Sequence, residues 1–154
     1  MSDLAYSVER EYPVPIDRMW HAWTDASALQ EWYAPTGLAV VSGSTVSEPV
    51  IGGRWATAVD ASAYGHVAYF WGRYSEVDEP MRVVHSMSYS QDESDFLEHS
   101  DEAEQHLVTI DMEPRGEGCW VRFAQYGDMP AEQAQMAQQG LESYFDSLGN
   151  FLTR

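Results

Sequence analysis

Two histidines and several tyrosines are the side chains of this 154-residue chain that could act on a small molecule. His85 and His106 each stand in a segment of alternating apolar residues, where a strand would point them into a core. An imidazole in a cavity titrates near neutral pH and could serve as a general base. Arg10 or a tyrosine such as Tyr89 would then stabilise a developing oxyanion. Each histidine could equally be a hydrogen-bonded strand residue with no chemistry.

Other kinds of site find little support in the sequence. The serines between residues 86 and 90 lack the Gly-x-Ser-x-Gly turn of a serine hydrolase. Cys119 begins a predicted strand, where packing is the simpler role, and as the single cysteine it forms no internal disulfide. His99 and His106 lie among carboxylates, but their spacing matches no metal-ligand pattern. We therefore expect no metal site and no obligatory cofactor.

The charge of the chain is strongly negative. It carries 25 acidic residues against 8 basic ones, all arginine, for a formal net charge of −17. Such a surface repels phosphate backbones and anionic lipid, which argues against a nucleic-acid or membrane-surface role. The negative charge could attract a cationic partner, or it could serve solubility alone. With no membrane-length apolar run and no signal peptide at the start, we expect a cytoplasmic protein.

A predicted antiparallel sheet positions the histidines and tyrosines that could act on a small molecule. Alternation in residues 6–12 predicts a first strand with one buried face. Six more strand-like segments are joined mostly by short turns, including a hairpin at "RGEG", which predicts a meander. They are 38–48, 52–61, 66–77, 81–90, 106–114 and 119–127. The acidic segment 91–105 is most simply a solvated loop.

Three helices complete the prediction. Two short ones lie between residues 15 and 34, where Asp25 caps the second, and they carry three tryptophans. A long helix over 130–152 has one broad apolar face, although its first half is more polar and less buried. The sequence therefore predicts one α+β domain over 1–154. In it a curved antiparallel sheet wraps around the long helix, and the tryptophans plug one end.

The order of these elements resembles the helix-grip fold of the START-like (SRPBCC) superfamily. The nearest likeness is to bacterial proteins related to the activator of the heat-shock protein 90 ATPase. The segments that carry it are "REYPVPIDRMWHAWTDASALQEWYAP", "IGGRW", "GRYSEVDEPMRVVHSMSY", "HLVTIDMEPRGEGCWVRFAQYG" and "QQGLESYFDSLGNFL". Leu141 departs from a frequent tryptophan and Gln125 from a frequent histidine. The resemblance implies the fold and leaves the activity open, because this fold supports binding proteins, cyclases, hydrolases and co-chaperones.

The resemblance implies a cavity between the sheet and the long helix. Aromatic walls with a few convergent polar groups are typical of a small-molecule site. The same rings could instead fill the core completely. The residues that we expect to line such a cavity are Trp32, Trp55, Phe70, Tyr74, His85, Met87, Tyr89, Ile110, Phe123, Gln125, Tyr144 and Leu148.

Three functions follow from these observations. The first is binding of a hydrophobic or aromatic small molecule in the cavity. The second is a co-chaperone-like or stress-related role that requires a protein partner. The third is a cofactor-free cyclase, dehydratase or hydrolase that uses a cavity histidine. The chain could be a monomer or a homodimer, because small domains often pair symmetrically.

Overall fold

The computed structural model describes residues 3–154. Its central feature is one antiparallel sheet. Over these residues it has eight strands, and β1 to β8 follow the order β1-β8-β7-β6-β5-β4-β2, while β3 also pairs with β4. The strands are β1 (Leu4–Tyr12), β2 (Ala39–Val40), β3 (Val46–Ser47), β4 (Arg54–Ala61), β5 (His66–Asp78), β6 (Arg82–Ser90), β7 (His106–Arg115) and β8 (Gly118–Tyr126). The predicted meander is thus confirmed, and the first strand, β1, pairs with the last strand, β8.

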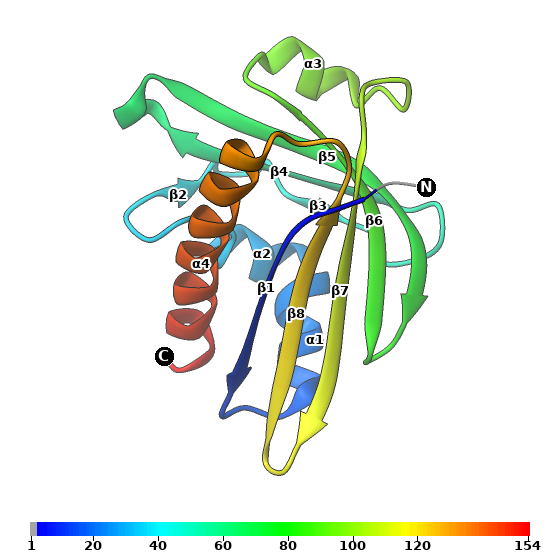
Figure 1. The fold of residues 1–154 in the computed structure, drawn as a ribbon, viewed down its shortest axis with the longest axis vertical. Helices are drawn as coiled ribbons and strands as arrows, with labels where there is room; N and C mark the ends of the chain where they lie inside the picture. The colour runs from blue at the N-terminus through cyan, green and yellow to red at the C-terminus, as the bar shows by residue number, and fades with distance from the viewer. Residues whose placement is uncertain (1–2) are drawn as a thin grey trace.

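The helices lie on the concave side of this sheet, apart from one. Figure 1 shows the sheet curling around the long helix α4 (Ala131–Leu152), with α1 (Ile16–Thr24) and α2 (Ala26–Trp32) at the end opposite α3 (Glu93–Glu98). A single 3₁₀ turn, η1 (Ser62–Tyr64), joins β4 to β5. Within residues 3–154, no helix is both long and apolar enough to cross a bilayer. The helix-grip architecture predicted from the sequence is confirmed.

The tryptophans of the two short helices fill the space between sheet and helix at one end. The ring of Trp23 lies 6.2 Å from Phe123 on β8 and 5.9 Å from Phe145 on α4. Trp32 meets Trp23 edge-on at 4.8 Å, and its indole N–H donates to the backbone oxygen of Ala22. Since helices this short are marginal in water, this packing is what stabilises them.

Residues 38–48 correct one prediction, because they do not form a continuous strand. Two short strands, β2 and β3, pair with successive parts of β4 and are separated by a turn. The turn includes Gly43, whose φ of 76° suits glycine, and Ser44, which bonds back to Val41. The many Val and Ser residues of this segment predicted extended chain but gave no sign of the break.

The acidic segment 91–105 corrects another prediction, because it is not simply a solvated loop. Asp92 caps α3 by accepting the backbone N–H of Ser94, and Phe96 is only 8% exposed. Phe96 packs on Trp71 on the outer face of the sheet, and the indole N–H of Trp71 donates to the oxygen of Ser100. One buried ring among many carboxylates anchors the segment. The acidic composition of the segment gave no sign of this burial.

Candidate functional site

A cavity of about 450 Å³ lies between the concave face of the sheet and the first half of α4. This volume is within the usual range for sites that bind small molecules. Strands β1 and β5 to β8 supply one wall, and the chain from Met129 into α4 supplies the other. The apolar part of the lining consists of Phe70, Met87, Phe123, Met129, Ala137 and Leu141.

A chain of hydrogen bonds forms the polar side of the cavity. The hydroxyl of Tyr6 donates to Oε1 of Gln125 at 2.6 Å, and the Nε2 of Gln125 donates to Nδ1 of His106 at 2.8 Å. Because Nδ1 accepts this bond, the proton of the neutral imidazole lies on Nε2. The three side chains therefore hold one another in place.

The sheet register explains why these three residues meet. Tyr6 is the cross-strand partner of Gln125, and His106 is its diagonal neighbour because Val108 lies opposite Gln125. The ring of His106 also packs against the backbone of Gly127. A Cβ at Gly127 would lie 2.5 Å from Cδ2 of His106, so glycine is required for this close approach.

Two tyrosines complete the interior of the cavity. The rings of Tyr33 and Tyr144 meet edge-on with their centroids 5.1 Å apart. Within residues 3–154 no hydrogen bond joins either hydroxyl to another residue, and neither oxygen is fully enclosed, so both are open to the cavity that they line. Burial raises the pKa of both phenols, so they stay protonated and can donate or accept.

The mouth of the cavity is built from exposed side chains. Tyr89 is 50% exposed, and its ring lies 5.3 Å from that of Phe70. Gln91 donates to the hydroxyl of Tyr89 at 2.8 Å. Glu104 from the end of the acidic segment and Gln133 from the first turn of α4 are the other exposed lining residues. The opening therefore lies at the end of the molecule that carries α3.

Six of the predicted lining residues are placed on the cavity and six elsewhere. Those on the cavity are Phe70, Met87, Tyr89, Phe123, Gln125 and Tyr144. The other six are fully or nearly fully buried in the packed core beyond it: Trp32, Trp55, Tyr74, His85, Ile110 and Leu148. Their strand phase or helix face is inward, as expected, but they lie too deep along the sheet or helix to reach the open space.

His85, one of the two histidines considered as a general base, lies in that core. Its ring stacks on Trp55 at 4.2 Å, and Nδ1 donates to the backbone oxygen of Ser86 at 2.8 Å. Burial lowers the pKa of His85 to about 4, which keeps the ring neutral near pH 7. The histidine that reaches the cavity is His106, from the neighbouring strand.

Arg10 also lies away from the cavity. Its guanidinium bonds to Asp146 at 2.7 Å and to Glu142 at 2.8 Å, both on the outer side of α4. This arginine ties β1 to the helix and has no access to a bound molecule. Within residues 3–154, no three His, Cys, Asp or Glu side chains gather closely enough to hold a metal ion.

Several lining residues escaped the sequence analysis. Tyr6 has the inward phase of the first strand, a signal that could have placed it on the cavity. Tyr33 follows α2 at its C-cap, where no periodicity indicates its direction. Ala137 and Gly140 belong to the first half of the long helix, whose polar sequence suggested low burial, and Met129 lies just before it.

Solved structures with the same fold are numerous, although their sequences have diverged. A protein from Chromobacterium violaceum superposes with a TM-score of 0.77 at 21% identity, covering 94% of each chain. A protein from Silicibacter pomeroyi gives 0.76 at 19% identity over 96% of each chain. One from Staphylococcus epidermidis, solved by NMR, gives 0.77 at 18% identity over 99% of this chain and 90% of its own. At these identities the likeness shows the fold alone.

No protein with a curated description matches the chain significantly. The model of the family described as "Activator of Hsp90 ATPase homolog 1-like protein" matches residues 13–153. This match covers nearly the whole chain, including every helix and all strands after β1. The chain therefore belongs to the Activator of Hsp90 ATPase homolog 1-like family.

Proposed function

We propose that this protein binds a small, largely apolar organic molecule in the cavity between the sheet and the first half of α4. The observation that carries the proposal is the pair of tyrosines, Tyr33 and Tyr144, whose hydroxyls border the cavity without a protein partner. Because these hydroxyl oxygens are not fully enclosed by protein atoms, they are free to exchange a hydrogen bond with a molecule that enters the cavity.

The polar chain of the opposite wall supports the same proposal. Gln125 is held from both sides, by Tyr6 and by His106, so its amide cannot turn freely in the empty cavity. Preorganised polar groups beside apolar walls fix the orientation of a ligand at a low entropic cost. We propose that these groups orient the bound molecule and that the apolar side chains supply most of its affinity.

Filling the cavity from α4 tests the proposal. Gly140 lines the cavity, and a Cβ built at this position meets no atom within 4 Å. The first carbon of a leucine side chain at this position therefore meets no other residue, and we expect the rest of the side chain to enter the cavity. We expect the wild-type protein to bind the neutral fluorophore 1-aminoanthracene at one saturable site. Gly140→Leu should weaken this binding at least about tenfold, because the introduced side chain occupies the volume that the fluorophore needs.

A matched variant controls for effects on the helix. Gln135→Leu introduces the same side chain on the exposed side of α4, away from the cavity. It should bind the fluorophore as the wild type does. Equal affinity in Gly140→Leu and the wild type would show that the fluorophore binds elsewhere and would contradict the proposal.

A further inference from the structure

The walls of the cavity present aromatic rings from several elements. Six lining side chains are phenylalanine or tyrosine, and they form three contacting pairs. The face of an aromatic ring is electron-rich and attracts a cation that lies over it. The pairs are Tyr6 with Phe123 at 6.2 Å, Tyr33 with Tyr144 at 5.1 Å, and Phe70 with Tyr89 at 5.3 Å.

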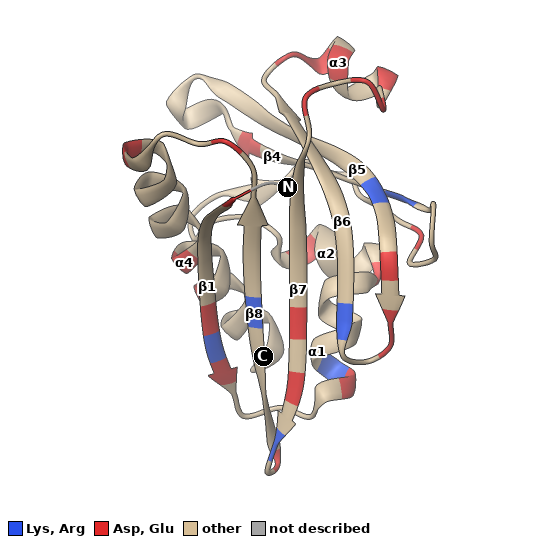
Figure 2. Cartoon of the chain, turned by 45° about the vertical axis from the view of Figure 1, so that its right-hand side comes forward, with Lys and Arg blue, Asp and Glu red and all other residues tan. Residues whose placement is uncertain are grey.

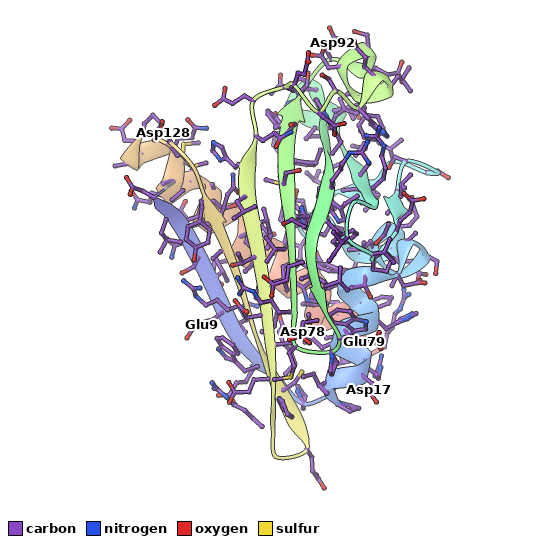
Figure 3. All side chains as sticks on the ribbon, turned by 90° about the vertical axis from the view of Figure 1, so that its right-hand side faces the viewer. Glu9, Asp17, Asp78, Glu79, Asp92 and Asp128 are labelled. Carbon is purple, nitrogen blue, oxygen red and sulfur yellow. The ribbon has the colours of Figure 1, made fainter. Side chains whose placement is uncertain are left out.

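Glu104 is the one carboxylate among the lining residues, whereas the two arginines that contact the acidic segment, Arg73 at Asp101 and Arg54 at the oxygen of His99, do not line the cavity. No arginine is among the lining residues, and the chain has no lysine. The segments 83–114 and 123–153, which border the mouth, contain no basic residue other than histidine, whereas Glu104 lines it. Figure 2 shows red and no blue around α3 and at the start of α4. Figure 3 places Asp92 and Asp128 at this same end of the molecule.

The guanidinium of Arg10 offers no compensating positive charge. Arg10 lies on β1, the strand that also carries Tyr6, but it is bound by Glu142 and Asp146. An anionic ligand would therefore find no countercharge in the cavity and would meet a negative field at the entrance. The hydroxyl oxygens of Tyr33 and Tyr144 can accept a hydrogen bond from an N–H group.

From this arrangement we infer that the ligand is an organic cation, an ammonium group carried by an aromatic or alicyclic body. The rings hold the cationic head, Glu104 and the negative entrance favour its approach, and the apolar lining receives the rest. This inference rests on the proposed function and narrows it to one class of ligand.

Three probes of the same shape and different charge test the inference. They are benzyltrimethylammonium, its neutral isostere neopentylbenzene, and the anion phenylmethanesulfonate, each titrated into the protein and followed by NMR shifts. We expect the cation to bind at least about tenfold more tightly than the neutral isostere, because several rings and a carboxylate face it. The anion should bind more weakly than both.

Two charge-removing variants locate the effect. Glu104→Gln should reduce the preference for the cation about three- to fivefold. Glu98→Gln removes the same charge from α3, where the side chain does not line the cavity, and should leave the preference unchanged. Equal effects of the two variants would show that Glu104 at the entrance has no specific part in the preference for the cation.

The outcomes separate this inference from the proposed function. If the cation and the neutral isostere bind equally, or the anion binds best, the charge preference is wrong while cavity binding stands. If none of the probes binds and Gly140→Leu leaves 1-aminoanthracene binding intact, the proposed function fails and the inference fails with it.

Discussion

The two halves of α4 face the same sheet, but the second half packs into a filled core and the first half borders a cavity. In the second half, Phe145, Leu148 and Leu152 are at most 1% exposed, and α4 packs against β1, α1 and α2. In the first half, Ala137 and Gly140 stand over open volume. A broad apolar face therefore does not by itself decide between a filled core and a cavity. Side-chain size along the helix decides it, together with what lies opposite.

The short helices account for the other part of this difference. They place Trp23 and Met19 beneath the second half of α4, where both are at most 1% exposed. The first half has no such plug, and Tyr33 at the end of α2 marks the boundary between the two regions. The fold thus combines a packed end, which supplies stability, with an open end that contains the cavity.

Substitution of two adjacent aromatic residues should produce the largest contrast. Phe145→Ala removes a fully buried ring from the packed end and should lower the free energy of unfolding by about 3–5 kcal/mol. Tyr144→Ala enlarges an existing cavity and should cost less than half as much. Urea denaturation of both variants checks this, and equal losses would show that the two ends are packed alike.

Acid should weaken the packed end through His85. The pKa of His85 is about 4 in the folded protein and ordinarily 6.5, so the unfolded chain binds its proton more readily. The contribution of His85 is therefore complete above pH 6.5 and is lost as the pH falls toward 4, by about 3 kcal/mol in total.

A variant without the imidazole isolates this effect. His85→Phe retains a ring against Trp55 but cannot titrate. Its free energy of unfolding should fall less steeply between pH 6.5 and 4 than that of the wild type. Parallel curves for the two proteins would contradict the account of His85 as a buried, neutral core residue.

Gly140→Ala, at the open end, should raise the free energy of unfolding. The position lies inside α4, and an added Cβ meets nothing within 4 Å. Alanine in a helix interior is more favourable than glycine by about 0.5–1 kcal/mol. The expected gain of that size is measured by thermal or urea unfolding. A loss of stability would mean that the wall at Gly140 is already filled.

The smallest effect concerns the tie between β1 and α4. Arg10→Met removes the ion pairs with Glu142 and Asp146 and retains the apolar stem. All three side chains are at least about a third exposed, so we expect a loss below about 1 kcal/mol that shrinks as salt is added. A loss independent of salt would indicate that packing, rather than charge, holds this contact.

Alternation and helical periodicity were sufficient to predict the fold but not the depth of each residue. His85 and His106 both have the inward phase of a strand, and only the three-dimensional position along the curled sheet separates core from cavity. Period-two patterning reports the face of a sheet and carries no information about distance from its open end. For that reason the set of lining residues was divided between the two regions.

The rest of the site depends on contacts that no local pattern reveals. Tyr33 is positioned by the end of α2, and His106 by the absence of a Cβ at Gly127, which follows β8. The burial of Phe96 was hidden in the same way, because α3 is anchored by Trp71, which lies far away in the sequence. Long-range packing decided each of these positions.

A crystal structure of the protein soaked with 1-aminoanthracene tests the central claim most directly. The account predicts density for the fluorophore between Tyr33, Tyr144 and Phe123, with the packed end of α4 unchanged. An empty cavity with the fluorophore bound at another surface, or a cavity closed by inward movement of α4, would contradict it.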